Sequence, residues 1–130
     1  MLLDAVGAYV DAGSALTVGT DLFKGLMPET PDVCVALYET PGERALEMVG
    51  GSTPTVERPH LQVVARATDY VTARTNSQTV HGILQAVTDL NLSGVRYLRI
   101  QPLQAPYLMG RDENRRVKVV FNCSVEKEPG

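Results

Sequence analysis

Residues 115–126 alternate between apolar and polar side chains, and this alternation restricts the fold more than any other stretch of the chain. Val117, Val119, Phe121, Cys123 and Val125 fall on one side of an extended backbone, and Arg116, Lys118, Val120, Asn122 and Ser124 fall on the other. Because successive side chains of a strand point to opposite faces, the pattern predicts a strand with one buried face. Such a strand needs partners in a sheet and an apolar layer packed against that face.

Three further stretches have the patterns of strands. Residues 33–39 are almost continuously apolar between Pro31 and Pro41, which predicts a strand buried on both faces. Residues 60–67 alternate like a half-buried strand, and residues 95–104 also favour a strand. We expect the strands 95–104 and 115–126 to pair as a long antiparallel hairpin.

Two stretches have helical spacing. Apolar residues of segment 2–12 recur on one helix face, and Gly13 supplies a stop. Segment 69–90 shows the same three- and four-residue steps, with Asp69 as the expected N-cap. Gly82 lies inside the second helix, where it costs about 1 kcal/mol relative to Ala, so we expect close packing at this position.

The remaining segments are rich in Gly and Pro and are predicted to be connections. They are a loop over 14–32, a long connection over 40–58 and a turn-rich connection over 105–114. The order of elements predicts an α+β fold, with about four strands in a mostly antiparallel sheet and two helices packed on one face. The length of 130 residues suits a single domain over 1–130.

Charge is unevenly distributed along the chain. The net charge is −3, but residues 1–57 sum to −7, residues 58–90 to +1 and residues 91–130 to +3. The overall acidity argues against a dedicated nucleic-acid binder. The acidic first half and basic last third allow head-to-tail association between copies, although a dipolar monomer with solvated faces is the plainer interpretation.

The sequence contains no apolar run of 18 residues and no basic segment at its start, which predicts a cytoplasmic protein without a membrane span. Its two cysteines, Cys34 and Cys123, lie within apolar strand-like stretches. We expect both to be buried free thiols, since a disulfide would need an oxidising compartment that nothing else indicates.

Residues that could perform chemistry are few. His60 and His81 have no Cys or acidic residue at metal-ligand spacing, and the segment Gly50-Gly51-Ser52-Thr53 lacks the lysine of a phosphate-binding loop. Asp112 and Glu113 could suggest calcium, but the alternating acids of a calcium loop are absent and a charged turn is the better interpretation. The sequence therefore predicts no catalytic residue, no metal, no cofactor and no enzyme.

A basic cluster is the strongest polar feature, and it comprises Arg111, Arg115, Arg116 and Lys118. Asp112 and Glu113 interrupt it, and no aromatic platform for stacking bases accompanies it. A protein–protein contact rich in arginine fits this composition better than phosphate binding.

Three stretches of the chain resemble a known family. The first is Phe23-Lys24-Gly25-Leu26-Met27-Pro28-Glu29-Thr30-Pro31-Asp32 with Val35-Ala36-Leu37-Tyr38-Glu39-Thr40-Pro41-Gly42. The second is Pro59-His60-Leu61-Gln62-Val63, followed by Arg66, Tyr70 and Ala73. The third is Tyr97-Leu98, Leu103-Gln104-Ala105-Pro106 and Gly110-Arg111-Asp112-Glu113-Asn114, leading to Phe121-Asn122. In this order they resemble the tail terminator and minor capsid proteins of the neck of long-tailed bacteriophages or phage-derived gene-transfer particles.

The resemblance implies a non-enzymatic virion protein, assembled in the bacterial cytoplasm. Such proteins form a hexameric ring, stop the growth of the tail tube and present a surface for joining the head. The implied partners are further copies of the chain, the tube protein and the head-completion or stopper protein. DNA would pass through the ring without sequence-specific binding.

We expect the connections 40–58 and 105–114 to make the assembly contacts. The candidate interface residues, chosen for predicted exposure and charge, are Arg111, Asp112, Glu113, Arg115 and Arg116. Three alternatives stay open: a head-completion or stopper protein of the neck, a small α+β ligand-binding domain or enzyme with a concave pocket, and a nucleic-acid-binding module.

Overall fold

The computed structural model describes residues 2–47 and 54–129. Two helices and seven strands follow one another along the chain. They are α1 (Leu2–Gly13), β1 (Leu22–Lys24), β2 (Cys34–Glu47), β3 (Pro54–Ala67), α2 (Tyr70–Gln85), β4 (Thr88–Leu92), β5 (Val95–Pro102), β6 (Tyr107–Arg111) and β7 (Val117–Lys127).

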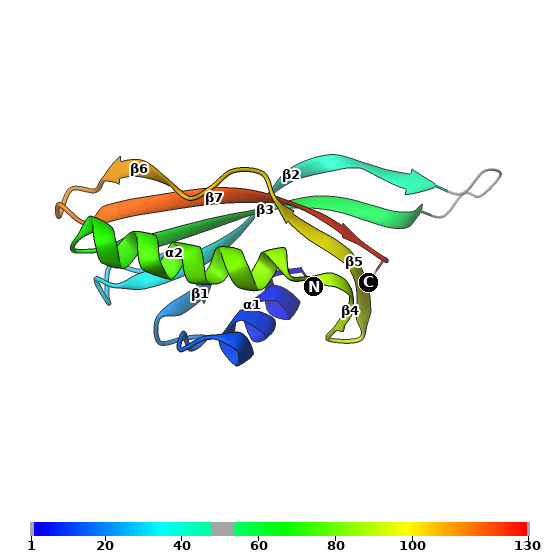
Figure 1. The fold of residues 1–130 in the computed structure, drawn as a ribbon, viewed down its shortest axis with the longest axis horizontal. Helices are drawn as coiled ribbons and strands as arrows, with labels where there is room; N and C mark the ends of the chain where they lie inside the picture. Colours follow the sequence, from blue (N-terminus) through cyan, green and yellow to red (C-terminus); the bar gives the residue numbers. More distant parts are fainter. Residues whose placement is uncertain (1, 48–53, 130) are drawn as a thin grey trace.

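All seven strands belong to one sheet, in the order β1-β2-β3-β7-β5-β4, with β6 also paired to β7. β1 and β2 are parallel, and every other pair is antiparallel. Both helices lie on one face of this sheet (Figure 1). The α+β class, the mostly antiparallel pairing and the helices on one face are confirmed, whereas the prediction of about four strands is wrong.

The core fills the space between the sheet and the helices. The alternating side chains of β3 and β7 point into it, which confirms the periodicity of the sequence. Its larger fully buried members come from both helices and from five of the strands: Val6, Val10, Leu22, Leu37, Leu61, Val63, Val80, Leu84, Tyr97 and Phe121. Cys34 and Cys123 are buried free thiols, as expected.

The long connection predicted over 40–58 is wrong where the structure describes it. β2 continues to Glu47, β3 begins at Pro54, and residues 48–53 lie outside the described residues. β2 and β3 stay paired across the Pro and Gly residues, because the register shifts between Thr40 and Glu43 and again near Leu46. The far ends of the two strands, residues 41–47 and 54–59, project beyond the rest of the sheet (Figure 1), and we call them the β2–β3 arm.

Helix α2 begins as predicted and ends early. The Asp69 side chain accepts a hydrogen bond from the Thr72 amide, which confirms Asp69 as the N-cap. The helix stops at Gln85, and residues 88–92 form β4, so the expected helix to residue 90 is wrong. The expected close packing at Gly82 is also wrong, because a Cβ built there meets no atom within 4 Å.

Strands also occur within two predicted connections. β1 interrupts the expected loop over 14–32, and β6 interrupts the connection over 105–114. β5 and β7 do pair antiparallel, as predicted, but they are not joined by a simple turn. The chain leaves β5 at Pro102 and returns as β6, which pairs with the first residues of β7.

Candidate assembly surface

The turn between β6 and β7 is built around one carboxylate. The Asp112 side chain accepts hydrogen bonds from the backbone amides of Asn114 and Arg116, at 3.0 and 2.9 Å, and from Arg116 Nε at 2.7 Å. The Asp112 amide in turn donates to the Arg116 carbonyl. Burial raises the pKa of Asp112, but the hydrogen bonds from Arg116 and Asn114 outweigh it, so the net pKa lies below its ordinary value.

Arg116 ties this turn to a distant segment, residues 28–32. Its guanidinium, on a side chain only 5% exposed, donates to the Glu29 carbonyl and lies 3.4 Å from both the Asp32 and Glu29 carboxylates. The Asn114 side chain adds a hydrogen bond to Glu29 at 3.3 Å. The β6–β7 turn and residues 28–32 therefore form one continuous surface.

A second buried arginine holds the same segment from the neighbouring strand β3. Arg66, 3% exposed, donates to the carbonyls of Pro28 at 2.6 Å and Pro31 at 2.7 Å, and more weakly to those of Glu29 and Asp32. These bonds satisfy carbonyls that no strand or helix pairs. We call Arg66 and Arg116 together the arginine clamp.

The five sequence-predicted interface residues divide into two groups. Arg111, Glu113 and Arg115 are exposed at the tip of the sheet, as expected. The expected exposure of Arg116 is wrong, because internal carboxylates and a carbonyl surround its guanidinium. Asp112 is only partly exposed, since its carboxylate faces Arg116. Three of the five are thus available to another molecule.

Beside this turn the surface is hollowed to about 590 Å³ between residues 25–29 and the β6–β7 turn. Bases and acids both line it, including Arg111, Lys118, Glu29 and Glu113. A hollow of mixed charge suits a polar protein contact better than a simple anion.

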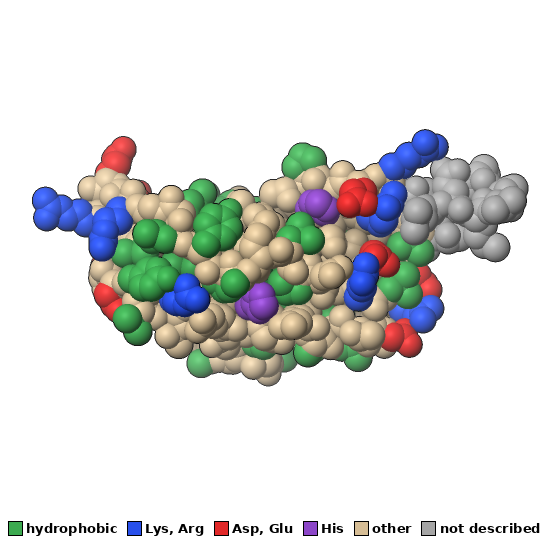
Figure 2. Space-filling view, turned by 45° about the horizontal axis from the view of Figure 1, so that its top comes forward, with side chains coloured by type: hydrophobic (Ala, Val, Ile, Leu, Met, Phe, Trp, Pro, Cys, Tyr) green, Lys and Arg blue, Asp and Glu red, His purple; other side chains and the backbone are tan. Residues whose placement is uncertain are grey.

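An exposed apolar patch lies next to the charged tip. The large exposed apolar side chains of this region are Tyr107, Leu108 and Met109 of β6, Leu103 before it, and Tyr70 and Val71 at the start of α2. Arg74 links the two elements by donating to the Tyr70 hydroxyl at 2.7 Å and to the Pro106 carbonyl at 3.4 Å. Figure 2 shows apolar side chains gathered at this end of the molecule, with Lys, Arg and acidic side chains beyond them.

Sequence reasoning missed both the clamp residue Arg66 and this patch. The patch had a visible signal, three consecutive large apolar residues directly after Pro106 within a predicted turn. Arg66 had a weaker one, because it is a single charge inside the apolar strand 60–67.

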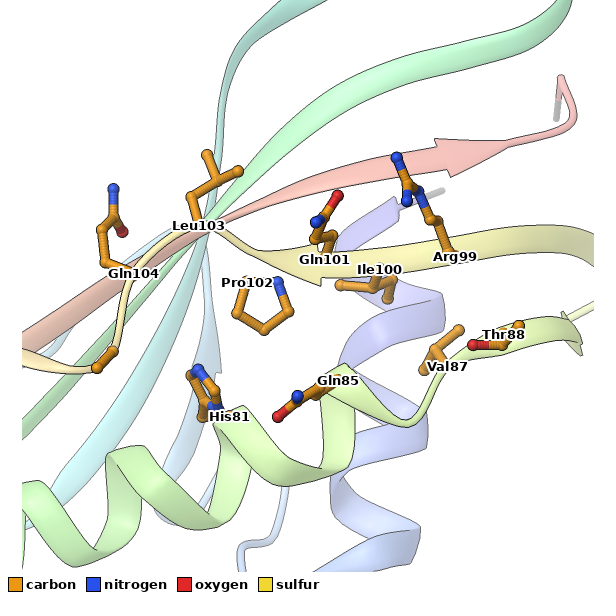
Figure 3. A pocket seen from close by; sticks show the side chains of 11 residues that line it. His81, Gln85, Val87, Thr88, Arg99, Ile100, Gln101, Pro102, Leu103 and Gln104 are labelled. Carbon is orange, nitrogen blue, oxygen red and sulfur yellow. The ribbon is translucent and has the colours of Figure 1, made fainter.

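A groove of about 490 Å³ lies between α2 and β5 (Figure 3). His81 and Gln85 line it from the helix, and residues 99–105 line it from β5 and the chain that follows (Figure 3). The His81 ring packs edge-on against Phe121, with 5.1 Å between centroids. No acid or thiol is among the described residues that line this groove, so its geometry offers no paired acid and base.

Other sites of chemistry are likewise missing from the described part of the chain. Within residues 2–47 and 54–129, no three His, Cys, Asp or Glu side chains gather as metal ligands. Burial raises the pKa of both thiols, that of Cys123 to about 12, so neither is a ready nucleophile. In the same residues, no helix is long and apolar enough to cross a membrane.

Comparison with known proteins identifies a family. The model of the bacteriophage tail terminator protein family matches residues 9–128. The chain therefore belongs to the bacteriophage tail terminator family, whose members are structural proteins of the virion. No curated protein matches the sequence.

Solved structures share the fold, and two of them illustrate the similarity. One is a chain in the virion of a native gene transfer agent particle, with a TM-score of 0.61 and 16% identity over 95% of this chain and 84% of that chain. A second has a TM-score of 0.53 and 16% identity over 99% of this chain and 92% of that chain. The expected resemblance to phage and gene-transfer proteins is thus confirmed at the level of family and fold.

Proposed function

We propose that this chain is the subunit of a ring that caps the tail tube. The ring, most simply a hexamer of copies meeting head to tail, ends tube polymerisation and presents its other face to the head-completion or stopper protein. DNA passes through the central hole without sequence-specific contacts. The match of the tail terminator family to residues 9–128 is the observation that supports this proposal.

The shape and charge of the molecule are compatible with this role. A head-to-tail contact needs two different faces that complement each other. The β2–β3 arm and the charged β6–β7 tip lie at opposite ends of the sheet (Figure 1). The acidic first half and basic last third of the chain supply charges of opposite sign for such a contact.

Among the sequence-predicted interface residues, Arg111, Glu113 and Arg115 are the ones that we propose for assembly contacts. Asp112 and Arg116 act indirectly, by holding the turn that presents them. The β2–β3 arm remains a proposed contact as well, now as a projecting hairpin rather than a loop.

The experiment is a polymerisation assay with purified tail tube protein from the same phage or gene-transfer particle. Tubes are grown with and without this chain, and their lengths are measured by negative-stain electron microscopy. We expect substoichiometric amounts of the chain to shorten the tubes. A length distribution that does not change with added chain would contradict the proposal, and binding to the portal side instead would favour the neck alternative.

A pair of variants tests the tip. Arg115→Glu reverses an exposed charge at the β6–β7 turn and should weaken capping. Gln78→Glu adds a carboxylate to an exposed position of α2 and serves as the control that should cap normally. If both variants cap tubes equally well, Arg115 does not belong to the assembly interface.

A further inference from the structure

Strand β6 leaves apolar side chains and one backbone edge uncovered. Tyr107, Leu108 and Met109 are 45, 54 and 56% exposed. β7 is the only strand that pairs with β6 among the described residues. An exposed apolar edge strand is prone to pair with another chain, and natural proteins either protect such an edge or use it.

The direction of the backbone groups of β6 follows from its partner. The Leu103 amide donates to the Asn122 carbonyl at 2.8 Å, so even-numbered residues of β7 direct their backbone groups to this side. Tyr107 and Gly110 stand opposite Val120 and Lys118 and therefore face β7. Leu108 and Arg111 face the open side, where their amides and carbonyls can pair with a further strand.

Strand β2 has the complementary open edge. β1 covers only Val35 to Leu37, and the Gly25 amide closes this pairing on the Leu37 carbonyl at 2.7 Å. By the same alternation, Glu39 is the next residue that directs its backbone outward. Beyond it, the described residues place no strand against this edge as far as Glu47.

The polarity of the two edges is compatible with pairing. β2, β3, β7 and β6 are adjacent and successively antiparallel, so β6 runs opposite to β2. In a ring of equally oriented subunits, β6 of one copy would therefore meet β2 of the next in an antiparallel sense. The open parts of the two strands lie toward opposite ends of the sheet, so neighbouring subunits would be staggered, as strands are in closed barrels.

Charge selects a register. Arg111 and Arg115 are exposed, and no carboxylate among the described residues forms an ion pair with either guanidinium. Glu39 on the β2 edge is exposed and likewise forms no ion pair within the described residues. Placing Arg111 opposite Glu39 makes an antiparallel pair of two residues that both direct their backbones outward, and it brings the unpaired charges together.

We propose that β6 of one subunit adds to the open edge of β2 in the neighbouring subunit, with Arg111 opposite Glu39, so that the sheets of the ring join into one. The occupant of the β6 edge is thus a second copy of this chain. The proposal rests on the ring assembly proposed above and specifies which surfaces meet.

Disulfide trapping tests this register. Glu39→Cys and Arg111→Cys are made in separate chains, mixed and oxidised under the conditions where wild-type rings form, alone or on tail tubes. Opposed strand positions have Cα separations that a disulfide can bridge. We expect a cross-linked dimer from this mixture only, because each chain has a single reactive thiol and Cys34 and Cys123 are buried. Gln78→Cys mixed with Glu39→Cys is the matched control.

A charge swap provides a second readout. Arg111→Glu and Glu39→Arg should each reduce the ring fraction in native mass spectra severalfold, and the double variant should recover it. Suppose that wild-type protein forms rings, but the Glu39→Cys and Arg111→Cys mixture shows no cross-link above the Gln78→Cys control and the double charge variant shows no recovery. These results would overturn the edge pairing while leaving the capping proposal intact. Wild-type protein that neither forms rings nor shortens tubes would overturn both.

Discussion

Arg66 and Arg116 bring two guanidinium groups into positions where most proteins keep apolar side chains. Neither guanidinium contributes to an exposed charged surface, because both are buried. Their N–H groups donate hydrogen bonds to carbonyl and carboxylate oxygens of residues 28–32 and of Asp112. This explains how a segment with two prolines and no helix or strand keeps a defined path. The same contacts determine how the β6–β7 turn is presented.

Arg66→Ala should destabilise the protein strongly. The variant leaves at least two well-bonded carbonyls, those of Pro28 and Pro31, without their donor. We expect a loss of roughly 3 kcal/mol in the free energy of unfolding, measured by urea denaturation. Arg115→Ala is the control, since its side chain is exposed, and should change stability little. Equal stability of Arg66→Ala and wild type would contradict the clamp.

Asp112 predicts a specific acid sensitivity. Its folded pKa lies below the ordinary value, so its contribution to stability is present above the unfolded pKa of about 3.9 and is lost as pH falls through the folded pKa. Asp112→Asn should lower the urea midpoint at pH 7, and the gap to wild type should narrow as pH falls below about 4. A gap of constant size from pH 7 to pH 3 would contradict this role.

Some helices and strands follow from the pattern of their own side chains, and others form only because they pair with a neighbouring strand. Helix α1, the N-cap of α2 and the alternating strands β3 and β7 follow from the periodicity of their own side chains. β1 and β6 are short, and pairing with β2 and β7 defines them rather than any internal pattern. Val87 and Leu90 fit the spacing of a longer helix, but the chain turns into β4 after Ala86.

The β2–β3 arm shows why the Pro and Gly residues of segment 40–58 led to the wrong prediction of a long connection. Pro41 lies on the outer edge of β2, where no strand of the same chain needs its amide. Gly42 occupies the register shift, with its Cα so close to β3 that an added Cβ would lie 2.2 Å from the Arg58 carbonyl oxygen. Local composition cannot distinguish such a bulged hairpin from a loop, because cross-strand contacts decide it.

Two glycine substitutions should therefore have opposite effects. Gly42→Ala forces the arm strands apart and should cost roughly 1–3 kcal/mol. Gly82→Ala lies on α2 with open space around its Cβ, and should stabilise the protein by about 1 kcal/mol because alanine favours the helix. Thermal melting followed by circular dichroism measures both. A stabilising Gly42→Ala would contradict the close approach of the two strands.

At the scale of the whole molecule, the sequence predicted the region of the assembly surface but not the contacts within it. The sequence located the charged turn at 111–116, and the structure leaves Arg111, Glu113 and Arg115 exposed there. It could not distinguish them from the inward-facing Arg116, because that distinction depends on residues 28–32 packing against the turn. The apolar edge of β6 became recognisable only once β7 was seen to pair with one of its sides.

Family membership and fold lead to one central proposal, a ring of this chain at the end of the tail tube. The most direct test is cryo-electron microscopy of purified tail tubes incubated with the chain, followed by averaging of the tube ends. We predict one added ring of six copies at a single end of each tube and none along its length. Tubes with bare ends, or with the chain bound along their walls, would contradict the account.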